Sequence, residues 1–295
     1  MLKDNINNKS ETVHDILTFG KSYLKSANID SYSIDSEVLL MKALNFSKIQ
    51  LFTKDNYVLS PKEKKLYFDL LEKRNQLMPV QYIVGTCEFM GLDFDVNSST
   101  LIPRGDTEIL VEYAIDMINQ NNYKAILDIG TGSGAIAISI AKYCKNTKIT
   151  AVDISTGALE MAKSNAEKNA VLDRIQFTES NLFENINSKF DVIVSNPPYI
   201  RTDVIPTLMP QVKDYEPVTA LDGGIDGLDF YKDIISNAKN YLNKKGMLIF
   251  EIGYNQSNDV SELLKQQNFS NIKTLKDLAG LDRVVTAIYN EKLID

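Results

Sequence analysis

The sequence predicts an α/β protein with a doubly wound, parallel sheet, preceded by a small all-α N-terminal domain and joined to it by a β-hairpin linker. Strand-like and helix-like segments alternate from residue 101 to the end, the order that produces a parallel sheet with helices on both faces. Residues 1–77 show helical periodicity, and residues 78–100 are rich in β-forming side chains punctuated by Gly85 and Gly91. These changes of period place the domain boundaries at 1–77, 78–100 and 101–295.

Composition and charge narrow the functional classes. The 295 residues are 44% hydrophobic, 24% charged and carry a formal net charge of −7, which argues against a protein that mainly grips nucleic-acid backbone. Residues 1–75 hold 12 Lys+Arg and 10 Asp+Glu, a balance that fits an anionic partner or simply a solvated helix face. No signal peptide or membrane-length apolar run is visible, so we expect a cytoplasmic protein without membrane or direct nucleic-acid binding.

Cysteine and histidine usage excludes several chemistries. Cys87 and Cys144 form no C-x-x-C pair, and His14 is the single histidine. We therefore expect no metal site and no disulfide framework. His14 lies in a helical pattern and is interpreted as a helix-surface residue, which leaves no Ser-His-Asp or Cys-His mechanism.

The N-terminal zone contains helical patterns at residues 11–27, 33–44 and 60–77. In the last pattern, Ser60 stands at the N-cap, Pro61 at the first helical position and Glu63 at the capping-box position. Residues 89–96, "FMGLDFDV", alternate in hydrophobicity and are interpreted as one arm of a hairpin.

The C-terminal zone supplies the elements of the expected sheet. Strands are expected at residues 124–129, 148–153, 174–179, 190–195, 246–252, 271–277 and 283–289. Helices are expected at residues 134–143, 156–170, 228–242 and 258–267.

A glycine-rich loop follows the first of these strands, in the stretch "DIGTGSG". It contains Asp128, Gly130, Thr131, Gly132, Ser133 and Gly134. Such a loop brings backbone N–H groups close to a ligand, but nicotinamide and flavin folds share it. Here the spacing is G-x-G-x-G, and an acid precedes the first glycine by two residues. That carboxylate would repel a pyrophosphate and suits a cationic ligand.

Asp153 ends the next strand, where a carboxylate can accept both ribose hydroxyls of an adenosine-like ligand. The alternative is that Asp153 caps the helix that begins near Ser155. The two roles are compatible, and the glycine loop one strand earlier favours the ligand role.

The strand at 190–195 runs into Asn196, Pro197, Pro198 and Tyr199. Both prolines lack an N–H, and each restricts the residue before it, so the segment is stiff, rich in acceptors and poor in donors. The Asn196 side-chain oxygen and the Pro197 carbonyl can both accept from one NH2 group, and Tyr199 offers a flat face to a planar substrate. The alternative is a strand end broken by a Pro-Pro turn.

These residues suit methylation of a planar NH2 nitrogen, whose delocalised lone pair makes it a poor nucleophile. Two acceptors would fix its plane and aim its lone pair, so orientation supplies most of the catalysis. Their dipoles would also stabilise the positive charge that builds on nitrogen.

"DIGTGSG", Asp153 and "NPPY" together resemble class I S-adenosylmethionine-dependent methyltransferases acting on nitrogen. Over nearly its full length the chain resembles the HemK/PrmC family, the N5-glutamine methyltransferases of peptide chain release factors. Besides the glycine loop, the stretches that carry this resemblance are "LIPRGDTEIL" at 101–110, "SNPPYI" at 195–200 and "LDGGIDGLDFY" at 221–231.

The resemblance implies a class I methyltransferase sheet and S-adenosylmethionine as cofactor. The loop at 128–134 would hold its methionine part, Asp153 its ribose, and Asn181 and Leu182 its adenine, with Asn196 also close to the cofactor. Asn196, Pro197 and Tyr199 would be catalytic and, with Pro198, bind the glutamine amide. The helical domain would dock the release factor, whose Gly-Gly-Gln tip would enter the crevice.

The chain departs from the family pattern at two positions. Gly105 replaces a proline in the run I-P-R-P-E/D-T-E, which loosens the backbone before a helix expected at Thr107. Arg104 and Glu108 of that run remain, as organisers of the surrounding structure. Asn181 stands where an Asp is usual, so it can accept from adenine without a charge.

Several functions compete with this one. One alternative is a glutamine methyltransferase of a ribosomal protein, which shares the architecture. Another is a DNA or RNA adenine-N6 methyltransferase, in which the adenine substrate would offer a similar flat NH2 group to NPPY. The acidic α/β zone disfavours the nucleic-acid enzyme. A non-enzymatic cofactor-binding module would not need Asn-Pro-Pro-Tyr, and a dehydrogenase would lack a suitable acid or base.

Overall fold

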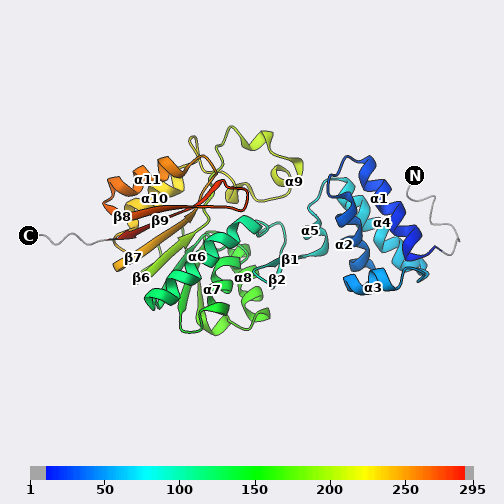
Figure 1. Ribbon diagram of the computed structural model, residues 1–295, viewed down its shortest axis with the longest axis horizontal. Coiled ribbons are helices and arrows are strands. Elements are labelled where there is room, and N and C mark those ends of the chain that lie inside the picture. Colours follow the sequence, from blue (N-terminus) through cyan, green and yellow to red (C-terminus); the bar gives the residue numbers. More distant parts are fainter. Residues whose placement is uncertain (1–10, 290–295) are drawn as a thin grey trace, which may run out of the picture. The chain divides into compact units, whose positions relative to one another are not determined.

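The computed structural model describes residues 11–289, which divide into two compact units (Figure 1). The helical unit comprises the described residues up to Gly85 together with Met209–Tyr215. The sheet unit comprises Thr86–Leu208 and the described residues from Glu216 onward. No helix in this described part of the chain is long and apolar enough to cross a membrane.

Apolar faces of short helices form the core of the helical unit, which includes Val13, Leu24, Leu39, Tyr67 and Leu71. Its helices are α1 (Val13–Ser26), α2 (Tyr32–Leu44), α3 (Lys48–Thr53), α4 (Pro61–Asn75), α5 (Val80–Val84) and α9 (Pro210–Lys213). His14 is exposed on α1, as expected.

The capping prediction for α4 is confirmed: Ser60 accepts from the Glu63 N–H, and the Glu63 carboxylate accepts from the Ser60 N–H. Residues 80–84, in contrast, were expected in a β-rich segment and form α5. Pro79 lies directly before this helix and Gly85 ends it in the left-handed conformation, with φ 79°. These helix start and stop residues outweigh the β-propensity of the short segment.

The sheet unit alternates strands and helices as the sequence predicts. Its strands are β1 (Thr86–Phe89), β2 (Leu92–Asp95), β3 (Ala125–Ile129), β4 (Lys148–Asp153), β5 (Ile175–Glu179), β6 (Phe190–Ser195), β7 (Leu242–Glu251), β8 (Phe269–Lys276) and β9 (Asp282–Tyr289). Its α-helices are α6 (Gly105–Asn121), α7 (Ala135–Tyr143), α8 (Thr156–Lys168), α10 (Asp229–Ala238) and α11 (Ser257–Gln266). Single 3₁₀ turns are η2 (Leu172–Arg174), η3 (Ile205–Thr207) and η4 (Val218–Ala220).

Strands β1 and β2 form an antiparallel hairpin in which Phe89 pairs with Leu92. Met90 and Gly91 make its turn, both with positive φ, as a two-residue hairpin loop requires. Residues 89–96 are therefore the end of one arm, the turn and the second arm, and their interpretation as a single arm was wrong.

The main sheet has the strand order β5-β4-β3-β6-β7-β9-β8. The strands from β5 to β7 are parallel, whereas β9 runs antiparallel to β7 and β8 antiparallel to β9. The short connection between β8 and β9 forces this exception, because parallel neighbours need a longer crossover. Helices α6, α7 and α8 cover one face and α10 and α11 the other (Figure 1), which confirms the predicted α/β class.

Chain direction across the sheet reverses between β3 and β6. From β3 the chain moves outward through β4 and β5, and then returns to place β6 on the other side of β3. Ile129 pairs with Ser195 at the carboxyl ends of these two strands. Ligands of open α/β sheets bind in the crevice outside this kind of switch point, so the topology places the glycine loop and the Asn-Pro-Pro-Tyr segment at one site.

Candidate functional site

A cavity of about 550 Å³ opens in the sheet unit at the carboxyl ends of β3, β4 and β6. Several of the sequence-predicted site residues line it: Gly130, Thr131, Gly132, Ser133, Asp153, Asn181, Leu182, Asn196, Pro197 and Pro198. Asp128, Gly134 and Tyr199 are absent from its wall. The structure thus gathers most of the predicted residues around one cavity, and three of them do not line it.

The glycine loop turns sharply from β3 into α7. Gly130, Gly132 and Gly134 all have left-handed φ values, of 72°, 56° and 83°. A Cβ on Gly134 would also lie 2.7 Å from Cδ1 of Ile138, so only glycine fits there. The loop therefore lets α7 begin directly at the cavity wall, where backbone N–H groups of a helix N-terminus are available.

Asp128 lies at the end of β3 and is completely buried behind this loop. Its Oδ2 accepts from the Thr131 hydroxyl at 2.7 Å, whereas Oδ1 has no hydrogen-bond partner among the described residues. Burial raises the pKa of Asp128 to about 7 and the nearby charge of Asp153 raises it further, whereas the hydrogen bond from Thr131 lowers it. A buried, incompletely satisfied carboxyl is costly, so a positive charge on a ligand in the cavity would stabilise its ionised form.

Asp153 braces the loop from the end of β4. Its Oδ2 accepts from the Gly132 N–H and its Oδ1 from the Ser155 N–H, both at 2.9 Å. The N-cap of α8 is Ser155 itself, whose hydroxyl accepts from the Ala158 N–H, so the alternative that Asp153 is the helix cap was wrong. Burial raises the pKa of Asp153, while these backbone hydrogen bonds lower it.

Asn181 and Leu182 reach the cavity from the loop after β5. Asn181 Nδ2 donates to Oε1 of Glu184 at 3.0 Å. A carboxylate can only accept, so Glu184 fixes the amide and leaves Asn181 Oδ1 as the atom available to a ligand. That orientation fits an acceptor for an adenine amino group.

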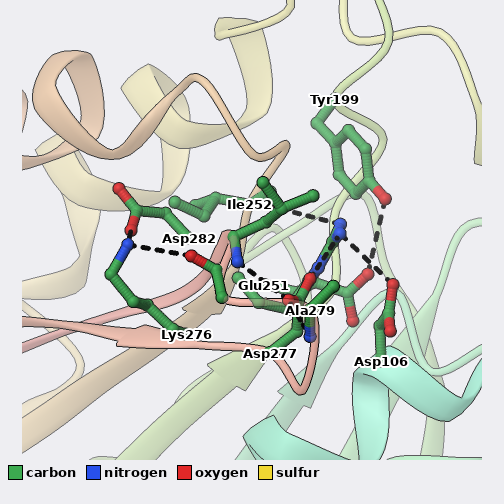
Figure 2. A network of polar contacts seen from close by, with 11 residues as sticks. Asp106, Tyr199, Glu251, Ile252, Lys276, Asp277, Ala279 and Asp282 are labelled. Atoms are coloured by element: carbon green, nitrogen blue, oxygen red, sulfur yellow. Dashed lines mark hydrogen bonds and ion pairs between the residues drawn. The ribbon is translucent and has the colours of Figure 1, made fainter.

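The Asn-Pro-Pro-Tyr segment begins where β6 ends. The Ser195 hydroxyl donates to the Ile129 carbonyl at 2.8 Å, which ties the ends of β6 and β3 together. Asn196 Nδ2 donates to the Thr107 hydroxyl oxygen at 3.3 Å. Tyr199 turns its hydroxyl to Oε1 of Glu251 at 3.4 Å (Figure 2), and burial, followed by the charge of Glu251, raises the Tyr199 pKa to about 12.

Residues that the sequence analysis did not select hold this segment in place. Gln256 Nε2 donates to the Tyr199 carbonyl at 3.0 Å and to the Gly227 carbonyl at 3.1 Å. A Cβ on Gly227 would lie 2.5 Å from the Tyr199 carbonyl oxygen, so no larger residue fits at this position. The signal for Gln256 and Glu251 was present: "EIGYNQ" ends a strand on the same sheet edge, and Glu251 interrupts an apolar run.

Residues of the stretch 101–110 lie both at the cavity and at the hairpin turn. Arg104 lines the cavity, and its guanidinium lies 2.5 Å from Oε1 of the buried Glu216. Glu108 instead accepts from the Met90 N–H at 2.6 Å, at the hairpin turn. Helix α6 begins at Gly105, two residues before the expected Thr107, because glycine is accommodated in the first helical turn.

Fold and site together define a class I methyltransferase. The catalytic domain of hMettl16 in complex with an RNA hairpin has the same fold, with a TM-score of 0.58, 17% identity, and coverage of 76% of this chain and 83% of that one. A methyltransferase from Pyrococcus furiosus matches with a TM-score of 0.51 and 21% identity over 68% of this chain and 91% of the other. The Methyltransferase small domain family matches residues 105–209, and the PrmC N-terminal domain family matches residues 15–85.

The particular family follows from full-length relatives. A release factor glutamine methyltransferase of Clostridium acetobutylicum is 46% identical over 279 residues, which cover 94% of this chain and 98% of the relative. One of Geobacter sulfurreducens is 40% identical and covers 93% and 95% of the two chains. The chain belongs to the release factor glutamine methyltransferase family.

Proposed function

We propose that this enzyme transfers a methyl group from S-adenosylmethionine to the side-chain amide nitrogen, N5, of the glutamine in the Gly-Gly-Gln motif of peptide chain release factors. The observation that carries the proposal is the place of Asn196 on the cavity wall, across the switch point from the glycine loop. The names of the relatives in Clostridium acetobutylicum and Geobacter sulfurreducens support the same reaction and the same substrate.

The residues around the cavity fit S-adenosylmethionine. The charge of Asp128 would act from behind the loop on the cationic cofactor, and the N–H groups of the loop at 128–134 would hold its methionine part. Asp153 has a carboxylate oxygen on each side for the ribose hydroxyls, and Asn181 Oδ1 is left as an acceptor for adenine. When bound, the cofactor supplies an electrophilic methyl group.

The protein's part in the reaction is to hold the glutamine amide. Asn196 Oδ1 and the Pro197 carbonyl accept its two N–H bonds, which fixes the amide plane and directs the nitrogen at the methyl group. The acceptors also stabilise the positive charge that develops as the N–C bond forms and the S–C bond breaks. The methylated nitrogen then loses a proton to solvent, so no strong base is needed before transfer.

The regions of the chain would divide the work. We assign release-factor docking to residues 1–77, a linking role to residues 78–100, and catalysis to residues 101–295. In support, the helical unit exposes large apolar side chains, including Ile49 and Phe52 with 75% and 56% of their surface accessible. Exposed apolar groups of this kind favour a protein partner.

The test is a mass-spectrometric transfer assay with deuteromethyl S-adenosylmethionine. Release factor, the same factor with Gln→Ala in its Gly-Gly-Gln motif, a ribosomal protein mixture and adenine-rich DNA are offered separately. We expect label on the motif glutamine alone and its loss in the Gln→Ala factor. Label only on ribosomal protein or DNA would contradict the substrate and keep the methyl-transfer chemistry. Cofactor binding without any label would contradict the enzyme assignment.

A further inference from the structure

The side chain of Asn165 joins three segments that are far apart in the sequence. Asn165 lies on α8 and is completely buried. Its Oδ1 accepts from the Asp95 N–H of β2 at 2.7 Å, and its Nδ2 donates to the carbonyls of Asp95 and Ser133, both at 2.9 Å. Ser133 belongs to the glycine loop and lines the cavity. One buried amide therefore holds the hairpin and the glycine loop together.

The register of the hairpin explains why α8 supplies this amide. In an antiparallel pair, every second residue turns its N–H and C=O away from the partner strand. Asp93 and Asp95 are two residues apart on β2, and the backbone of each bonds to a side chain of α8 or its C-cap. Asn169 Nδ2 donates to the Asp93 carbonyl at 3.1 Å, and Asn165 pairs with both backbone groups of Asp95. Amide side chains thus take the place of a further strand along the outer edge of β2.

Further contacts fix the hairpin within the sheet unit, where β2 lies beside α8 (Figure 1). At the hairpin turn, the Met90 N–H donates to Glu108 of α6, and the Met90 carbonyl accepts from the hydroxyl of Tyr143 in α7, both at 2.6 Å. At the end of β2, Lys168 of α8 forms an ion pair with Asp95 at 2.6 Å. The hairpin is therefore held by three helices of the sheet unit.

Residues of the hairpin and of the chain after it also form part of the cavity wall. Phe89 of β1 lines the cavity, and so do Ser99 and Thr100 after β2. Ser99 packs closely on the first turn of α8, because a Cβ on Gly157 would lie 3.2 Å from Ser99 Oγ. Ser155, the N-cap of α8, lines the same cavity. The position of the hairpin on α8 therefore sets the shape of this wall.

We propose that Asn165 is a positioning residue for the cofactor, and that the hairpin it holds is part of the cofactor site as well as a linker. The inference rests on the proposed function. Asn165 is outside the cavity wall and acts through the Ser133 carbonyl, which its hydrogen bond fixes. Three glycines with left-handed φ make the loop at 130–134 conformationally permissive. Fixing the loop before binding lowers the entropy cost of receiving the methionine part of S-adenosylmethionine.

The effect of Asn165 should be confined to one half of the cofactor. An apolar side chain at this position would leave the Ser133 carbonyl without its donor, so the loop would have to shift to satisfy it. The adenosine half is assigned to Asp153 and Asn181, and neither side chain bonds to Asn165. Loss of the amide should therefore weaken the hold on the amino-acid half and spare the adenosine half.

The experiment compares two neutral thioethers by calorimetry, S-adenosylhomocysteine and 5′-methylthioadenosine. Both carry the adenosine half, and only the first carries an amino-acid half. Asn165→Leu keeps the number and branching of the side-chain atoms and removes all three hydrogen bonds. The Kd of S-adenosylhomocysteine should rise about tenfold, the loss expected for one buried hydrogen bond. The Kd of 5′-methylthioadenosine should stay within about twofold of wild type.

Transfer kinetics give a second reading of the same variant. The KM for S-adenosylmethionine should rise about tenfold, while kcat at saturating cofactor and release factor should stay within about threefold of wild type. A general loss of structure would instead lower kcat and weaken both thioethers together.

Matched controls come from the same face of α8. Asn169→Leu is the same substitution four residues later, and it removes a hydrogen bond to the hairpin without touching the glycine loop. Lys168→Ala removes the ion pair with Asp95 and leaves the Asn165 amide in place. Both variants should bind both thioethers within about twofold of wild type.

The wild-type protein provides a measurement that does not depend on the folding of a variant. Binding of S-adenosylhomocysteine should slow amide hydrogen exchange in the hairpin at 86–95, because the hairpin supports the loop that the ligand orders. Strands β8 and β9, at the far edge of the main sheet, should exchange at an unchanged rate. If Asn165→Leu does not fold, this comparison decides the question, and an unchanged hairpin would overturn the inference.

The outcomes separate this inference from the proposed function. Equal weakening of the two thioethers by Asn165→Leu, or no weakening of either, would overturn the positioning role, while wild-type transfer to the motif glutamine would keep the proposed function. The expected difference between the thioethers without any wild-type transfer would keep the positioning role and overturn the proposed reaction. A wild-type protein that binds neither thioether would overturn both.

Discussion

Replacing the buried Asp128 with Asn should stabilise the ligand-free protein at alkaline pH and weaken its cofactor binding. The carboxyl is completely buried, with Oδ1 unpartnered among the described residues. Asn has nearly the same shape, carries no charge, and keeps an oxygen to accept from the Thr131 hydroxyl. The substitution therefore removes the cost of burying a charge, although the amide NH2 that takes the place of Oδ1 is buried without an acceptor and offsets part of the gain.

The magnitude follows from the pKa. Burial raises the Asp128 pKa from 3.8 to about 7. Each pKa unit corresponds to about 1.36 kcal/mol. Keeping this carboxylate ionised in the folded protein therefore lowers the free energy of unfolding by at most about 4 kcal/mol. An acid whose folded pKa is raised binds its proton more tightly in the native state. The stabilisation that the protonated Asp128 gives the folded state is therefore lost as pH rises from about 4 to about 7.

The assay is urea unfolding of wild type and Asp128→Asn at about pH 5 and about pH 8, with calorimetric titration of S-adenosylmethionine alongside. The variant should be more stable by about a third of the figure above at about pH 5, and by up to the whole figure at about pH 8. Cofactor affinity should drop about threefold to thirtyfold, because one charge near a cationic ligand is lost. Equal or lower stability of the variant at about pH 8 would refute the account of Asp128 as an uncompensated buried charge.

Three further substitutions test the site and its surroundings. Asn196→Ala should lower kcat by about a hundredfold or more with cofactor Kd within about threefold, and full turnover in the transfer assay would contradict the acceptor role. Asp153→Asn should weaken cofactor binding about tenfold, because one of the backbone N–H groups of Gly132 and Ser155 must then face an amide NH2 group. Calorimetry measures this affinity, and an unchanged value would limit Asp153 to a structural role. Gly105→Pro should raise the free energy of unfolding in urea by about 0.4–1 kcal/mol, because the residue is the first of α6 and Pro suits that position; a loss of stability would show that the Gly105 N–H is needed.

The fold was largely predictable because its signals are local. The alternation of strands and helices gave the class, and the carboxyl-edge rule placed Asp128, Asp153 and Asn196 on one edge of the sheet before any contact was known. The prediction was wrong at residues 80–84, where helix start and stop residues outweigh the β-propensity of the segment. Pro79 and Gly85 made a helix of an apolar segment with β-forming residues.

The sequence predicts several of the residues that line the cavity, but not the residues that hold them in place. The motifs in the sequence mark residues that line the cavity, such as Asn196. The residues that contact them come from distant elements: Thr107 of α6 accepts from Asn196, and Glu251 of β7 accepts from the Tyr199 hydroxyl. No local pattern in the sequence signals these contacts, because they depend on the register that places the ends of β6 and β7 side by side.

The segment Met209–Tyr215 shows the limit of local signals most clearly. It lies between two stretches of the sheet unit, yet it belongs to the helical unit, where Tyr215 donates to the Gln76 carbonyl at 2.6 Å and Gln211 accepts from Arg74 at 3.2 Å. The chain thus leaves the Asn-Pro-Pro-Tyr segment, joins the helical unit, and returns at Glu216, the partner of Arg104 in the cavity wall. The helical unit is in this way covalently connected to the sheet unit at both ends of this segment, as well as through Gly85. The four-residue helix in this segment is too short for a periodic pattern to predict that it packs with the helical unit. Its position is fixed by side-chain hydrogen bonds to residues far away in the chain.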